Sequence, residues 1–142
     1  MKTQQRPINE IIIHCTATPA RMIVTMSKLE QWHKKRGFAT IGYHYVIDQL
    51  GKINTCRPEQ QQGAHCKGHN FNSIGIAYIG GIDDRTCQPA DTRTTAQRKS
   101  LIQLIIDICQ RHDILNICGH NYYANKTCPC FNAAHEYYHL LP

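Results

Sequence analysis

The sequence has 142 residues, which is the usual length of one domain. Hydrophobic residues make up 42% and charged residues 18% of the chain, which allows a folded core and excludes the disordered and fibrous classes. No apolar run is long enough to cross a membrane, and the first ten residues lack the apolar stretch of a secretory signal. We therefore expect one domain over residues 1–142, made in the cytoplasm and without membrane insertion.

The charge is positive, with 16 basic residues against 10 acidic ones and a net charge of +6. Such a balance suits a polyanion such as nucleic acid, a membrane surface or a bacterial cell wall. The basic residues are scattered, and their one run, Lys34-Lys35-Arg36, is simplest as the solvated end of a helix. Charge alone therefore does not identify the partner. The eight cysteines are expected to be reduced thiols, some of them in the core and some as metal ligands.

The first predicted elements are a strand and a helix. Residues 11–13 are three consecutive isoleucines, typical of a buried strand, and this strand ends at His14. Ser27 and Glu30 have the spacing of a capping box, which predicts a helix that Gly37 ends. His33 falls inside this helix, and we expect it to be a surface or cap residue.

The middle of the chain reads as strands and turns. Residues 43–48 and 53–56 are predicted to pair as a hairpin around a turn at residues 49–52. Residues 74–79 predict another strand, and the polar segment 83–93 predicts a loop.

The last third begins with the longest predicted helix. Thr94 and Gln97 have capping-box spacing, and the helix should run to about His112 with an apolar face made of Leu101, Leu104, Ile105, Ile108 and Cys109. Residues 114–118 predict a final strand, followed by a loop and a short C-terminal helix. The irregular alternation of strands and helices indicates an α/β fold with a mixed central β-sheet flanked by helices.

Three residues have the chemistry of a catalytic zinc site, which needs three protein ligands and one open position. His14 ends the first strand, His120 follows the last strand, and Cys128 lies eight residues further along. Ligands at the ends of adjacent strands can converge on one ion. A histidine at a strand end is also common as a structural residue, and a cysteine before proline is common in packing. Spacing alone leaves both interpretations open.

Several segments occur in order along the chain: IIIHCTAT (11–18), GYHYVID (42–48), GAHCKGHNFNSIGI (63–76), GGIDD (80–84), PADTRT (89–94), GH (119–120) and NKTCPCF (125–131). Together they resemble the type-2 N-acetylmuramoyl-L-alanine amidases, especially the short bacteriophage lysozymes of that family. Animal peptidoglycan-recognition proteins share this fold. The resemblance covers residues 11–131, and its several independent segments make it specific.

The resemblance implies roles for individual residues. His14, His120 and Cys128 match the ligands of one zinc ion per chain, Tyr43 matches the tyrosine beside the reacting water, and Lys126 matches the lysine that stabilises the oxyanion.

The resemblance also implies a substrate groove. His65 matches a position that lines the groove for glycan and peptide, and His69 is a further candidate there. Some branches of the family carry a catalytic glutamate where this chain has Ala77, so the chain resembles the tyrosine-dependent branch.

The resemblance implies zinc-dependent hydrolysis of the amide between N-acetylmuramic acid and L-alanine in bacterial peptidoglycan. The expected partner is peptidoglycan or a muropeptide rather than nucleic acid, and the expected state is a monomer that stays in the cytoplasm until it is released to the cell wall, as in an endolysin.

Some positions depart from the family pattern. Tyr122 and Asn132 replace acids that many relatives carry, so we expect weaker zinc affinity than usual. Cys130 is the rival of Cys128 as ligand, and the spacing to Lys126 favours Cys128. Cys15 is expected to face away from the site, into the core.

Two alternatives remain at this stage. The first is a peptidoglycan-recognition module without hydrolysis, but such relatives typically lose the cysteine ligand, which is present here. The second is an unrelated zinc protein that contacts nucleic acid, which leaves His14 unexplained and lacks paired C-x-x-C motifs.

Overall fold

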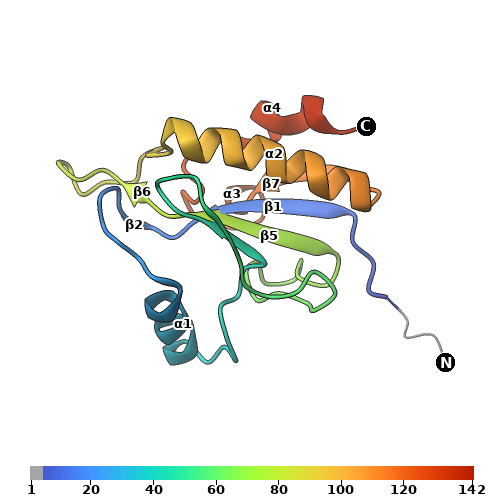
Figure 1. Ribbon diagram of the computed structural model, residues 1–142, viewed down its shortest axis with the longest axis horizontal. Coiled ribbons are helices and arrows are strands. Elements are labelled where there is room, and N and C mark those ends of the chain that lie inside the picture. The colour runs from blue at the N-terminus through green and yellow to red at the C-terminus, as the bar shows by residue number, and fades with distance from the viewer. Residues whose placement is uncertain (1–4) are drawn as a thin grey trace.

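A computed structural model describes residues 5–142, in which helices lie on both faces of a five-stranded sheet (Figure 1). The sheet has the order β4-β3-β5-β1-β7 and is formed by β1 (Glu10–Cys15), β3 (Tyr45–Ile47), β4 (Ile53–Thr55), β5 (Ser73–Tyr78) and β7 (Asn116–Gly119). Strand β4 is antiparallel to β3, whereas the other neighbouring strands are parallel. The predicted mixed sheet is therefore confirmed.

Helices α2 (Thr95–Arg111) and α4 (Ala133–Tyr137) lie on one side of the sheet, and α1 (Met26–Lys35) lies on the other (Figure 1). Because side chains alternate along a strand, β1 faces both layers. Ile11 and Ile13 pack in the apolar cluster that includes Leu101 and Ile105 of α2. Ile12 and His14 therefore lie on the opposite face, and this face carries the site.

The two predicted capping boxes have different outcomes. Thr94 caps α2 as predicted, since its side chain accepts from the N–H of Gln97 while the Gln97 side chain accepts from the N–H of Thr94. The box at Ser27 is wrong. Helix α1 begins at Met26, two residues earlier than a cap at Ser27 would give, because the hydroxyl of Thr25 accepts the N–H of Lys28 and makes Thr25 the N-cap.

The hairpin β3–β4 and the strand β5 are confirmed, with bounds that differ by one or two residues from those predicted. The segment expected to be a plain loop after β7 contains a short helix, α3 (His120–Tyr123). Two further strands, β2 (Thr18–Pro19) and β6 (Gly81–Ile82), form a separate ribbon that the sequence did not indicate. None of the helices in the described part of the chain is both long enough and apolar enough to span a bilayer.

Candidate active site

The carboxyl ends of β1 and β7 bring the first two predicted ligands together. Ile13 pairs with Gly119 in the parallel ladder, so His14 and His120 each follow directly after a paired position. The centroids of the two imidazole rings are 4.7 Å apart. Cys128 completes the group, with its Sγ 3.8 Å from Nδ1 of His14. The three residues offer ligand atoms that all lie within 4.8 Å of one another, which suits a single ion.

The segment after α3 is fixed so that Cys128 reaches the strand ends. The backbone N–H of Asn121 donates to the carbonyl of Cys128 at 2.9 Å, and the hydroxyl of Tyr78 donates to the carbonyl of Pro129 at 2.7 Å. The backbone N–H of Cys15 donates to Sγ of Cys128 at 3.2 Å. These bonds tie Cys128 to β1 and β5, so its position depends on the sheet.

The electrostatic environment keeps the candidate ligands in their metal-binding forms. Burial lowers the pKa of His14 well below its ordinary value. The pKa of His120 is lowered mainly by burial and to a smaller extent by the charge of Lys126. Both rings are therefore neutral at pH 7. Hydrogen bonds from Cys15 lower the pKa of Cys128, whereas the same contact and burial raise the pKa of Cys15. Two neutral imidazoles and one thiol with a lowered pKa are a donor set that fits zinc.

Cys15 is buried, with 3% of its surface exposed, so its predicted place in the interior is confirmed. Its backbone nevertheless borders the ligand group, because its N–H donates to Sγ of Cys128 at 3.2 Å and its carbonyl accepts from the same thiol at 3.8 Å. Its contact with Cys128 comes from the loop that returns more than a hundred residues later in the chain.

Tyr43 lies beside the ligand group, in the segment just before β3. Its ring centroid is 5.1 Å from that of His14 and 5.3 Å from that of His33. Burial raises the pKa of Tyr43, so the phenol keeps its proton at neutral pH. A protonated phenol next to the ligands can donate a hydrogen bond and a proton to a reacting group.

His33 is not a surface residue, contrary to expectation, since 5% of its surface is exposed. Its Nδ1 accepts the backbone N–H of Gly42 at 2.8 Å, and its ring packs against Phe38 and Tyr43. Burial lowers the pKa of His33 to about 4, which keeps the ring a neutral acceptor. His33 therefore holds the backbone next to Tyr43, a role that no sequence spacing indicated.

Two cavities that share lining residues lie at the ligands. The smaller, about 160 Å³, is lined by the three ligands and Tyr43, and the larger, about 640 Å³, extends towards Phe38 and Tyr123. Lys126 and Arg36 line both cavities. The basic run that includes Arg36 is thus only partly a solvated helix end, because Arg36 itself borders the site.

The two histidines predicted for the substrate groove differ in their surroundings. The ring of His69 stacks on Tyr123, with centroids 3.6 Å apart, and Tyr123 forms part of the wall of the larger cavity. His65 borders both cavities with only 8% of its surface exposed. Both ring nitrogens of His65 contact protein groups, Nε2 of His14 at 2.8 Å and Oγ of Ser73 at 3.2 Å.

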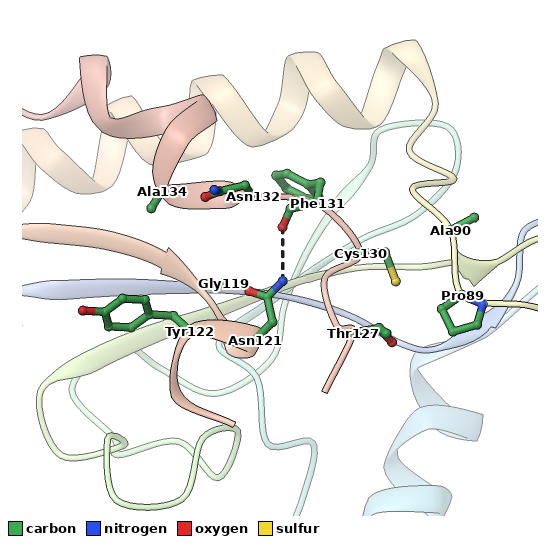
Figure 2. A pocket seen from close by; sticks show the side chains of 10 residues that line it. All are labelled: Pro89, Ala90, Gly119, Asn121, Tyr122, Thr127, Cys130, Phe131, Asn132 and Ala134. Carbon is green, nitrogen blue, oxygen red and sulfur yellow. Dashed lines mark hydrogen bonds between the residues drawn. The ribbon is translucent and has the colours of Figure 1, made fainter. Parts of the chain in front are cut away.

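A separate pocket of about 570 Å³ is lined by Thr127, Cys130 and Phe131, which belong to the segment that also carries Cys128 (Figure 2). Cys130 lines this pocket opposite Pro89 and Ala90, whereas Cys128 lines the cavity with the histidines. The thiol of Cys130 donates to the carbonyl of Gly81 at 3.5 Å. The geometry therefore favours Cys128 over Cys130 as the third ligand.

The positions that replace family acids lie away from the ligand atoms. Tyr122 has 70% of its surface exposed. The side chain of Asn132 accepts the N–H of His135 at 3.0 Å and thereby caps α4. Asn132 therefore has a structural role that needs no negative charge.

Comparison with known proteins agrees with this geometry. The family model described as N-acetylmuramoyl-L-alanine amidase matches residues 4–131. The endolysin of Escherichia phage T7 is 36% identical over 129 residues, covering 91% of this chain and 85% of that protein. A peptidoglycan-recognition protein of Drosophila melanogaster is 30% identical and covers 92% of this chain and 72% of its own length. The solved structure of N-acetylmuramoyl-L-alanine amidase LysC from Clostridium intestinale superposes with a TM-score of 0.79 at 28% identity, covering 96% and 90% of the two chains.

The mixed sheet and its flanking helices are thus the fold of type-2 amidases and peptidoglycan-recognition proteins. The chain belongs to the N-acetylmuramoyl-L-alanine amidase family, and it is an enzyme of that activity.

Proposed function

We propose that this enzyme is a zinc-dependent, endolysin-like amidase that separates the lactyl group of N-acetylmuramic acid from L-alanine in bacterial peptidoglycan. One observation carries the proposal: His14, His120 and Cys128 converge within 4.8 Å at the strand ends, next to Tyr43 and Lys126. A zinc ion held by these three residues would polarise the scissile carbonyl and would make water reactive near neutral pH.

The chain's own residues would supply the remaining steps. The phenol of Tyr43, which stays protonated, would orient the attacking water and pass a proton towards the leaving amine. Lys126, on the rim of the ligand cavity, would place positive charge where the tetrahedral intermediate becomes negative. The ligand cavity lies beside the larger cavity. A peptidoglycan substrate that occupies the larger cavity could therefore place its scissile amide at the ligands.

The larger cavity suits the stem peptide. Arg36, Lys67 and Lys126 give its wall positive charge, and Phe38 and Tyr123 add aromatic surface. Stem peptides carry carboxylates, so this wall complements them in charge. We propose that His69 takes part through its stack on Tyr123, and that His65 borders the same groove.

The test is turnover of a soluble muramoyl-peptide by zinc-replete, chelator-treated and zinc-restored protein. We expect about one zinc per chain, loss of activity on chelation and recovery on adding zinc. Circular dichroism should change little on chelation, because α2 and β1 pack through an apolar core that does not include the ligands. Replete protein without zinc would contradict the mechanism, and collapse of the fold on chelation would indicate a structural metal instead.

The site of action and the assembly state follow as further parts of the proposal. We propose action on the cell wall after synthesis in the cytoplasm, and the endolysins among the relatives support the first part, action on the wall. We propose that the chain acts as a monomer, which light scattering of the purified protein would test.

A further inference from the structure

A chain of hydrogen bonds leads from His14 into the interior of the protein. Nε2 of His14 lies 2.8 Å from Nδ1 of His65, and Nε2 of His65 lies 3.2 Å from Oγ of Ser73. The hydroxyl of Ser73 lies 2.7 Å from the backbone carbonyl of His69. Each of the three side chains has at most 8% of its surface exposed. Solvent therefore contributes little to the direction of these bonds.

The last member of the chain fixes the direction of every bond before it. A carbonyl oxygen can only accept, so the proton of Ser73 points to His69 and the Ser73 oxygen accepts from Nε2–H of His65. A neutral imidazole has one N–H, so Nδ1 of His65 is an acceptor and Nε2 of His14 is its donor. This leaves the lone pair of His14 on Nδ1, the nitrogen that lies 3.8 Å from Sγ of Cys128.

The ring of His65 is held in a space that two glycines create. A Cβ on Gly75 would lie 2.6 Å from Cγ of this ring, and a Cβ on Gly63 would lie 2.7 Å from its Cδ2. The loop that carries the ring is anchored as well, because the N–H groups of His65 and Cys66 both donate to Oδ1 of Asn70 at 2.9 Å. The position of the ring is thus fixed by its neighbours, and both of its nitrogens make hydrogen bonds. A residue that only lined the substrate groove would need neither feature.

We propose that His65 is a positioning residue for the metal centre, which accepts Nε2–H of His14 and thereby selects the tautomer that presents Nδ1 to zinc. The inference rests on the proposed zinc site and goes beyond it, since it assigns a function to His65, Ser73 and the glycine pair. A partner that accepts the second N–H of a ligand histidine fixes the orientation of the ring and commonly raises metal affinity about 10–100-fold.

The tautomers can be read directly by nitrogen-15 NMR of the histidine side chains in the metal-free wild-type protein at neutral pH. We expect His14 and His65 both to carry the proton on Nε2. A proton on Nδ1 of His14 would overturn the inference. This measurement needs neither zinc nor a variant, so it is separate from the test of the proposed function, which fails if the wild-type protein does not bind zinc.

Zinc affinity, measured by competition with a chromophoric chelator, tests the consequence. His65→Leu fills the space without an acceptor and should weaken zinc binding about 10–100-fold. His65→Asn should recover part of the loss, because its Oδ1 is attached to Cγ as Nδ1 is in histidine. Gly75→Ala, which crowds the unaltered His65 ring, should also weaken zinc binding.

His69→Ala is the matched control, since His69 takes part in this series of hydrogen bonds only through its backbone carbonyl. The zinc affinity of this variant should equal that of the wild type. Circular dichroism checks the fold of each variant. If His65→Leu does not fold, Ser73→Ala serves in its place, with a smaller loss expected. Unchanged zinc affinity in a folded His65→Leu protein, with only KM raised, would show that His65 acts on the substrate alone and would overturn the inference.

Discussion

On the α2 side of the central sheet, Ile11 and Ile13 of β1 pack against the apolar face of that helix. On the opposite side of the same strand, His14 contacts His65, and Ile12 packs in a small cluster with buried cysteines. The first face is stabilised by non-directional burial, which many side chains of suitable size satisfy. The second face holds buried polar groups that need specific hydrogen-bond partners. The comparison shows that one strand can contribute to two different environments. On one side it adds to a core that accepts many apolar substitutions, and on the other it adds to a site that requires specific hydrogen-bond partners.

The largest effect on zinc binding should come from substitution of the ligand Cys128. Cys128→Ser should lower zinc affinity by more than about 100-fold, because a hydroxyl is a poor zinc ligand. Loss of a direct ligand should weaken binding more than loss of a residue that only contacts a ligand. Cys130→Ser is the matched control and should keep zinc and activity, because Cys130 lines a different pocket from the one that contains the histidines. Metal analysis of both proteins decides it. Loss of zinc in the Cys130 variant alone would contradict the assignment.

The residues beside the ligands should affect rate without affecting metal. Tyr43→Phe and Lys126→Ala should keep stoichiometric zinc and lower kcat about 100–1000-fold with little change in KM, because both are proposed to act on the transition state. Tyr138→Phe and Lys99→Ala are controls at exposed positions away from the ligand cavities. Steady-state kinetics with zinc measured in the same samples tests this, and normal kcat in both site variants would remove their proposed roles.

The apolar face should respond in stability instead. Ile105→Ala, at a fully buried position of α2, should lower the free energy of unfolding by about 2–4 kcal/mol while the folded protein keeps its zinc and kcat. Ile102→Ala on the same helix, where 40% of the residue's surface is exposed, should cost much less. Urea unfolding of the two variants provides the measurement. Equal losses would mean that the face of α2 does not carry the core.

A smaller effect is expected from pH. Burial raises the pKa of Glu59, but hydrogen bonds from Arg111, Tyr45 and His112 outweigh it and hold the pKa at about 2, below the ordinary value of 4.5. A carboxylate with a lowered folded pKa stabilises the fold above about pH 4.5 and loses that contribution as pH falls towards 2. Allowing for solvent screening, the contribution is about 1 kcal/mol.

Urea unfolding at pH 5 and pH 3 measures this contribution. Glu59→Gln should lose less stability than the wild type between these two values, since it has no charge to remove. Asp113→Asn, at an exposed position, should follow the wild type. An unchanged pH dependence in Glu59→Gln would mean that its hydrogen bonds do not favour the charged carboxylate.

The sequence predicted what depends on local patterns. The first strand, the helix capped by Thr94 and the apolar face of α2 follow from periodicity and from capping chemistry, and the structure bears them out, with the strand ending one residue later than predicted, at Cys15. Ser27 failed because a second capping residue, Thr25, lies two positions earlier and its hydroxyl reaches Lys28. Two local signals competed there, and spacing did not distinguish them.

The site could be predicted only in part, because its finer features depend on contacts between distant segments. His33 is buried because Gly42 donates to it across the turn after α1, and Cys15 meets Cys128 only when the loop after α3 returns to β1. His65 contacts His14 from a loop 51 residues away. Residue types and their neighbours in the sequence carry no record of such pairings.

The central claim is that the His14–His120–Cys128 group directs hydrolysis of one particular amide. Mass spectrometry of purified peptidoglycan digested by the zinc-replete enzyme tests it most directly. The account predicts free stem peptides that begin with L-alanine, together with glycan strands whose lactyl groups are unsubstituted, and neither product after chelation. Cleaved glycan strands with stem peptides still attached, or the same products from fully metal-free protein, would contradict it.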